Sequence, residues 1–123
     1  MDTHSGGCLC GKVRFTTNAQ PNRVGLCHCL DCRKRHGALF YAAAIFARAA
    51  VTVTGATREY RGGHFCPDCG SPVFAICDDE IEVKLGCFDA PDQFVPTYEN
   101  WTVRREAWLP AFPLESSYPH DRE

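Results

Sequence analysis

The sequence predicts a mainly β protein made of antiparallel sheets with a few short helical turns. Polar and apolar residues alternate in several short segments, and this period of two is typical of half-buried strands. Glycine, asparagine and aspartate separate these segments, which favours tight turns between them. Nine cysteines stand in short groups within 123 residues, and a domain of this size commonly supplements a modest core with bound metal.

Alternation and apolar runs locate the expected strands. We expect strands at 12–16 and 24–26, a buried strand over 39–47, a hairpin of 51–54 with 57–61, and a second hairpin of 72–77 with 80–88. The alanines in 39–47 also permit a helix. We expect one short helical turn that Asp31 caps at its start and Gly37 ends. A second helical turn is expected at 90–94.

The C-terminal part contains both tryptophans, Trp101 and Trp108. Trp108 is expected to be a core residue that closes the sheet, and for Trp101 the same role is one of two alternatives. The last segment contains Pro110, Pro113 and Pro119 and shows no periodicity. We therefore expect it to be extended or frayed.

Size and composition indicate one domain over residues 1–123 and exclude several classes of protein. A net charge of −2 provides no overall attraction to nucleic acid or to anionic lipid. No N-terminal signal peptide is expected, and no apolar run approaches the ~20 residues that span a bilayer. The odd number of cysteines, grouped in CxC and CxxC steps, favours metal over disulfides, so we expect a reducing cytoplasm.

Two cysteine pairs are spaced to close one metal site. Cys8 and Cys10 form a CxC step near the start, and Cys66 and Cys69 form a CxxCG knuckle. Thiolate is a preferred ligand of Zn²⁺, and structural zinc sites are tetrahedral with four protein ligands. The two pairs together therefore predict a closed zinc site with four sulfurs.

A third group, Cys27, Cys29 and Cys32, places three thiols within six residues and has no second group to pair with. Three ligands leave one tetrahedral position open, which is typical of catalytic rather than structural zinc. The alternative is that a fourth ligand folds in and makes the site structural; the candidates are Cys77, Cys87, His28 and His36. Cys77 and Cys87 lie in apolar runs, and we expect them to be buried and free of metal.

With these three cysteine groups, the sequence resembles a known family, the glutathione-dependent formaldehyde-activating enzymes. This family also includes the domain of centromere protein V. The matching blocks extend from Gly6 to about Phe112 and read GGCLCGKVRF, CHCLDCRKRHGALF, HFCPDCGSPVF and YENWTVRREAWL. The resemblance implies an Mss4-like fold with two zinc ions per chain. One would be held by the four paired cysteines and the other by the triplet.

The resemblance also implies an activity and a binding site. The implied reaction joins glutathione and formaldehyde reversibly to S-(hydroxymethyl)glutathione and is classed as a carbon–sulfur lyase reaction at the triplet. Arg33, Lys34 and Arg35 follow the triplet directly and are expected to hold the carboxylates of an acidic thiol; the alternative is a solvated basic face. Phe40, Tyr98 and Trp101 are expected to form apolar walls of the pocket.

Two other functions stay open. One is a zinc-stabilised binding module without turnover, as centromere protein V implies; nucleic acid is a poor candidate partner because the basic run is short and the net charge is negative. The other is a redox enzyme of the methionine sulfoxide reductase type. That type needs a reactive cysteine outside the metal groups, and only Cys77 and Cys87 are available.

Overall fold

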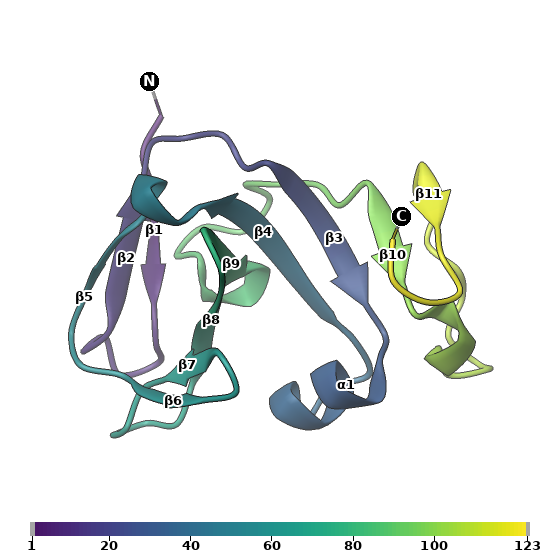
Figure 1. The fold of residues 1–123 in the computed structure, drawn as a ribbon, viewed down its shortest axis with the longest axis horizontal. Helices are drawn as coiled ribbons and strands as arrows, with labels where there is room; N and C mark the ends of the chain where they lie inside the picture. Colours follow the sequence, from purple (N-terminus) through teal and green to yellow (C-terminus); the bar gives the residue numbers. More distant parts are fainter. Residues whose placement is uncertain (1, 123) are drawn as a thin grey trace.

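The computed structural model describes residues 2–122, and the mainly β prediction is confirmed (Figure 1). Within these residues eleven strands form two sheets. The three-stranded sheet contains β1 (His4–Gly7), β2 (Arg14–Thr17) and β5 (Thr52–Thr54). The eight-stranded sheet contains β3 (Arg23–Cys27), β4 (Tyr41–Ala47), β6 (Arg58–Tyr60), β7 (Gly63–Phe65), β8 (Pro72–Cys77), β9 (Glu80–Lys84), β10 (Tyr98–Asn100) and β11 (Ser116–Ser117).

Helical structure is short, as predicted. The helix α1 (Leu30–His36) lies at the ends of β3 and β4, and 3₁₀ turns occur at Arg48–Ala50, Leu85–Cys87 and Thr102–Arg104. The prediction of a helical turn at 90–94 is wrong, because the chain only bends there. No helix among the described residues has the length and apolar character needed to cross a membrane.

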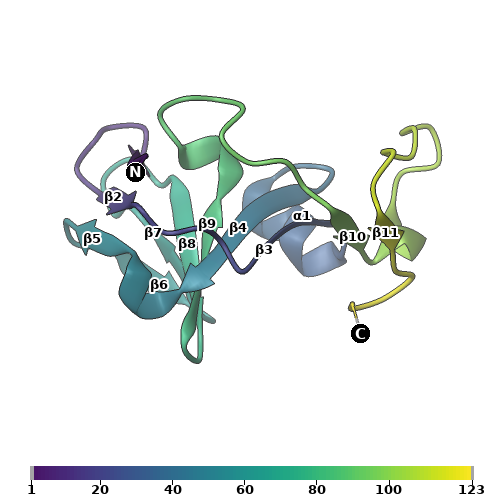
Figure 2. The same cartoon turned by 90° about the horizontal axis from the view of Figure 1, so that it is seen from above.

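The strand order of the larger sheet is β11-β10-β3-β4-β9-β8-β7-β6. Pairing is antiparallel from β3 to β6, as expected, but β10 runs parallel to both β3 and β11. A parallel neighbour needs a long connection. The chain from β3 to β10 passes through α1 and all the strands from β4 to β9, and a loop over residues 101–115 joins β10 to β11. Figure 2 shows that β10 and β11 lie at one end of the molecule and the N-terminal strands at the other.

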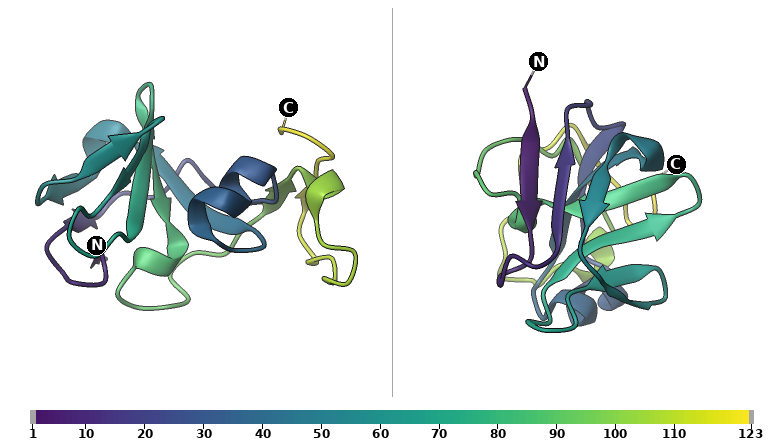
Figure 3. Two further views of the ribbon diagram at one scale, coloured as in Figure 1. Left: turned by 90° about the horizontal axis from the view of Figure 1, so that it is seen from below. Right: turned by 90° about the vertical axis from the view of Figure 1, so that its left-hand side faces the viewer.

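The core lies between the two sheets and follows from the period of two along each strand. Phe15 of β2, Phe46 of β4 and Ile81 of β9 belong to one core cluster, and all three are almost fully buried. Phe15 also meets Phe88 edge to face with ring centroids 5.1 Å apart. Figure 3 shows the three-stranded sheet from its own side of the molecule. Because one face of β3, β4 and β9 is buried in this core, only the opposite face of these strands is available for a functional site.

The two predicted hairpins have different outcomes. Strands β8 and β9 pair across Asp78-Asp79, although β9 ends at Lys84 rather than at residue 88. The predicted pairing of 51–54 with 57–61 is wrong: β5 pairs with β2 and β6 pairs with β7. Alternation identified both strands, but the turn after β5 carries the chain from one sheet to the other.

The predictions that Trp108, Cys77 and Cys87 are buried are also wrong. Trp108 is 69% exposed and is not a core residue. Cys77 is exposed at the end of β8, and Cys87 is only half-buried. Of the two alternatives for the final segment, the structure has the extended one: β11 pairs with β10, and the chain after it continues alongside Trp101.

Candidate metal centres and thiol cavity

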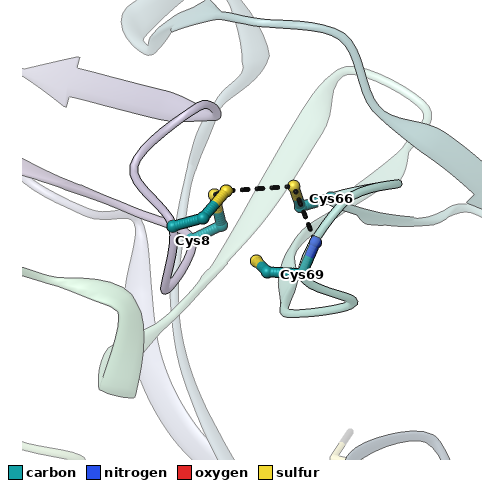
Figure 4. A group of neighbouring side chains, drawn as sticks. Cys8, Cys66 and Cys69 are labelled. Carbon is teal, nitrogen blue, oxygen red and sulfur yellow. Dashed lines mark hydrogen bonds between the residues drawn. The ribbon is translucent and has the colours of Figure 1, made fainter.

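The four paired cysteines converge from two loops, one after β1 and one after β7. The four sulfurs lie within 4.8 Å of one another. The Cys8 and Cys10 sulfurs are 3.6 Å apart, and those of Cys10 and Cys66 are 3.7 Å apart. A tetrahedron with metal–sulfur bonds of about 2.3 Å has edges of about 3.8 Å. The cluster therefore has the size of a four-thiolate metal site, and Figure 4 shows the two loops facing each other across it.

Backbone hydrogen bonds shape this cluster for thiolates. Gly70 adopts a φ of +80°, and its N–H donates to the Cys66 carbonyl at 2.9 Å. This turn directs the N–H of Cys69 at the Cys66 sulfur, 3.5 Å away. A hydrogen bond from the Ser71 hydroxyl lowers the pKa of the Cys69 thiol to about 5. Donors of this kind stabilise the negative charge that a metal-bound sulfur carries.

The second cluster is the triplet. Cys27 ends β3, Cys29 precedes α1 and Cys32 lies in its first turn, and their sulfurs lie within 4.8 Å of one another. Hydrogen bonding from the Cys32 thiol lowers the pKa of Cys27 to about 6, and the same contact raises the pKa of Cys32. The triplet therefore tends to share protons and negative charge, as expected of a metal-binding group.

The cap of α1 differs from the prediction. The N-cap residue is Cys29, whose sulfur accepts a hydrogen bond from the Cys32 N–H at 3.3 Å, while Asp31 lies inside the first turn. The helix begins two residues earlier than expected, because the sulfur of Cys29 rather than the carboxylate of Asp31 caps it. Gly37 ends the helix in the left-handed conformation, as predicted.

None of the four alternative ligands belongs to the triplet cluster in the described part of the chain. At the end of β3, the side chains of Cys27 and Cys29 point into the triplet cluster, and the side chain of His28 between them points away from it toward Glu99. The buried His28 donates from Nε2 to Glu99, 2.8 Å away. His36 donates from Nδ1 to the Cys32 carbonyl and stacks on Tyr41. Cys77 and Cys87 lie outside both clusters, and burial raises the pKa of Cys87 to about 11.

Glu99 holds a buried charge network behind the triplet. It accepts hydrogen bonds from His28 and Ser117 and pairs with Arg105 at 3.0 Å. Burial alone would raise the pKa of Glu99, but the hydrogen bonds from Arg105 and His28 outweigh it and keep the pKa below its usual range. A carboxylate that is 0% exposed thus joins β10 to the loop that carries Cys29.

We expect Glu99→Ala to destabilise the protein strongly, because it leaves His28 and Arg105 without their partner. Removing one member of a buried ion pair costs about 3–5 kcal/mol. Urea unfolding of the metal-loaded protein measures the loss, with the exposed Glu115→Ala as the matched control. Equal free energies of unfolding for the two variants would contradict this role of Glu99.

The triplet opens into a cavity of about 260 Å³ on the face of the sheet away from the core. Strand register explains its walls: Cys27 pairs with Tyr41 and Asn100, and Gly25 pairs with Ala43 and Tyr98. Residues two apart share a face, so the pocket side of the sheet carries the thiols, two tyrosines and Glu82. The wall also includes Arg23, Leu26, Ile45, Asp121 and Arg122.

Gly25 permits the close approach of one of these tyrosines. A Cβ at this position would lie 2.3 Å from the ring of Tyr98. Since no side chain tolerates that distance, only glycine lets Tyr98 lie flat over β3 at the cavity wall. On β4, the Tyr41 hydroxyl donates to Glu82, and burial raises the pKa of Tyr41.

Two of the predicted binding residues lie near the triplet. Tyr98 lines the thiol cavity itself. Trp101 lines a neighbouring hollow of about 440 Å³ that shares Cys29 and Asp121 with the cavity. Its indole N–H donates to Asp121 at 2.8 Å. The two hollows therefore meet at the triplet.

The structure places the other four predicted binding residues elsewhere. Arg33 forms an ion pair with Glu106. Lys34 and Arg35 line a separate hollow with Tyr60, Arg61 and Phe65. Phe40 packs between His28 and Phe112, behind the triplet.

Sequence reasoning missed the two arginines that do line the thiol cavity, Arg23 and Arg122. The period-2 spacing of Arg23, Gly25 and Cys27 on one strand is a signal that could have indicated the first. Nothing in the sequence pattern marks Arg122.

The fold and its two clusters define a β-sheet protein with two thiolate groups that could each hold a metal ion. The chain belongs to the glutathione-dependent formaldehyde-activating enzyme family, whose model matches residues 3–104. The fold is similar to that of a Rhodobacter sphaeroides protein of known crystal structure. That similarity has a TM-score of 0.57 at 20% identity and covers 72% of this chain and 91% of the other. No curated protein gives a significant match.

Proposed function

We propose that the protein binds two zinc ions and acts at the triplet as a carbon–sulfur lyase on a small thiol adduct, with glutathione and formaldehyde as reactants. The observation that supports this most is the convergence of Cys27, Cys29 and Cys32 on the wall of a cavity. The four-thiolate cluster holds a structural ion, whereas the triplet keeps one position for a ligand. The whole chain, residues 1–123, serves as one domain in a reducing compartment such as the cytoplasm.

The proposed reaction forms a C–S and an O–H bond and breaks the S–H bond and the C=O π bond. The thiol sulfur of glutathione attacks the formaldehyde carbon, the electrons of the C=O π bond move to oxygen, and that oxygen takes the proton that the thiol lost. Zinc, when bound, supplies Lewis acidity and favours the thiolate. The reverse sequence releases formaldehyde, so the protein accelerates the exchange in both directions.

The cavity wall provides groups for orientation and for proton movement. Tyr98 and Trp101 supply apolar walls on the two sides of Cys29. The Tyr41 hydroxyl, hydrogen-bonded to Glu82, offers a proton donor and acceptor pair in the same cavity. A volume of about 260 Å³ is below the range of about 300–1,000 Å³ for most ligand sites. The cavity therefore takes the reacting end of the thiol, and the neighbouring hollow takes part of the rest.

The basic run after the triplet has a different role from the cavity residues. We assign Lys34 and Arg35 to long-range attraction of an acidic thiol, because they lie on α1 but line a separate hollow. Arg33 orients the 104–106 segment through Glu106 and the Arg104 carbonyl. Phe40 supports His28 from behind.

The function is tested by NMR exchange spectroscopy on the zinc-loaded protein with glutathione and formaldehyde. Because the adduct also forms without catalyst, the measured quantity is the exchange rate between glutathione and S-(hydroxymethyl)glutathione above the protein-free rate. We expect a rate that increases in proportion to protein concentration. Tight glutathione binding without faster exchange would instead indicate a binding module.

A further inference from the structure

A C-terminal strap, residues 116–122, forms part of the thiol cavity although it lies beyond the residues that match the family, 3–104. The strap is held by backbone hydrogen bonds along β10 and the loop after it. Tyr118 donates to the Glu99 carbonyl at 2.9 Å, and Trp101 donates from its backbone N–H to His120 at 2.9 Å. These contacts place Asp121 and Arg122 on the cavity wall.

The other cation of the cavity is already neutralised. Arg23 donates from both terminal nitrogens to Glu80, each at 2.8 Å. This hydrogen bonding lowers the pKa of Glu80 to about 2, so the carboxylate stays charged at neutral pH. The fork of its two terminal nitrogens is therefore taken by Glu80, and its Nε–H, which has no partner, is buried away from a ligand.

The acidic groups of the cavity are also engaged. Asp121 accepts from the Trp101 indole, and Glu82 accepts from the Tyr41 hydroxyl. Arg122 differs: its guanidinium lies 5.9 Å from the centre of the Tyr98 ring, and it forms no ion pair within residues 2–122. Arg122 is thus the cation of this wall that can accept an anionic group from a ligand.

We propose that Arg122 is a specificity-determining residue, which accepts a carboxylate of an anionic thiol whose sulfur faces the triplet. This inference rests on the proposed function and names the substrate class as thiols that carry a carboxylate. A planar guanidinium binds a carboxylate through two parallel hydrogen bonds. The ring of Tyr98 lies beside the Arg122 guanidinium and limits the orientation of that guanidinium. The strap thereby adds a selectivity element to the family-matched part of the chain.

The test compares Arg122→Gln with Arg58→Gln, which removes an exposed arginine from β6 at the opposite edge of the same sheet. The probes are glutathione and glutathione diethyl ester, in which both carboxylates are masked. Calorimetry on the zinc-loaded proteins gives the dissociation constants, and NMR exchange gives the rates. Metal content is measured for each variant.

We expect Arg122→Gln to weaken glutathione binding about tenfold or more, as loss of a charge-assisted contact predicts. The diester should bind the wild type and Arg122→Gln equally, and Arg58→Gln should behave as wild type. Equal glutathione affinity in Arg122→Gln and wild type, or an equal loss for the diester, would overturn the proposal. A tenfold loss of glutathione binding without any catalysed exchange in the wild type would support Arg122 and overturn the lyase function.

Discussion

Cys66→Ser is expected to unfold the protein. Cys66 is 0% exposed, and its sulfur joins the loop after β1 to the loop after β7. Structural zinc provides about 10–16 kcal/mol of apparent binding energy in small zinc-dependent peptides, whereas whole domains are stable by only about 5–15 kcal/mol. Loss of this site therefore removes as much free energy as the fold has available.

Circular dichroism during thermal melting measures this effect, together with zinc content. The matched control is Cys77→Ser, which changes an exposed thiol outside both clusters and should melt as the wild type does. A Cys66→Ser protein that melts at the wild-type temperature with unchanged zinc content would rule out a structural role for this site.

Cys29→Ser is expected to abolish catalysed exchange and to remove one zinc ion while the fold survives. Cys29 is both a sulfur of the triplet and the N-cap of α1. Serine is among the best N-cap residues, so this substitution keeps the helix start and removes only the thiolate. The triplet lies at the end of β3 beside a cavity rather than between the two sheets, so its loss does not separate the layers.

The contrast between the two serine variants separates the roles of the two clusters. Zinc content, melting temperature and exchange rate are measured on the same preparations. If Cys29→Ser also unfolds the protein, the triplet is structural and the lyase proposal loses its main support. If it folds and retains full exchange activity, the chemistry takes place elsewhere.

Local sequence patterns predicted the parts of this molecule that depend on local geometry. The cysteine spacings identified both clusters, because a CxC or CxxC step brings two sulfurs together within one turn. The turn Asp78-Asp79 similarly identified the β8–β9 hairpin. Strand partners are a different matter: β5 and β6 are adjacent in sequence but belong to different sheets. Alternation of polar and apolar residues indicates which face of a strand is buried, but it does not indicate which strand pairs with it.

The cavity depended on long-range contacts and was predicted only in part. Tyr98 reaches the triplet because β10 pairs parallel to β3 over Gly25, a pairing between segments more than seventy residues apart in the chain. Arg33 was expected at the ligand because it follows Cys32 directly, but α1 turns it toward Glu106. Trp108 is expected in the core, yet it is exposed beyond the last 3₁₀ turn. Arg122 reaches the site only through the docking of the strap.

X-ray absorption spectroscopy at the zinc edge is the most direct test of an open thiolate centre that binds substrate sulfur. Without ligand, the average number of sulfur neighbours per zinc should lie below four, because the triplet supplies three and the closed cluster four. We predict that saturating glutathione raises this average to four, and that Cys29→Ser abolishes the rise. An average that does not change when calorimetry shows glutathione to be bound would contradict the account.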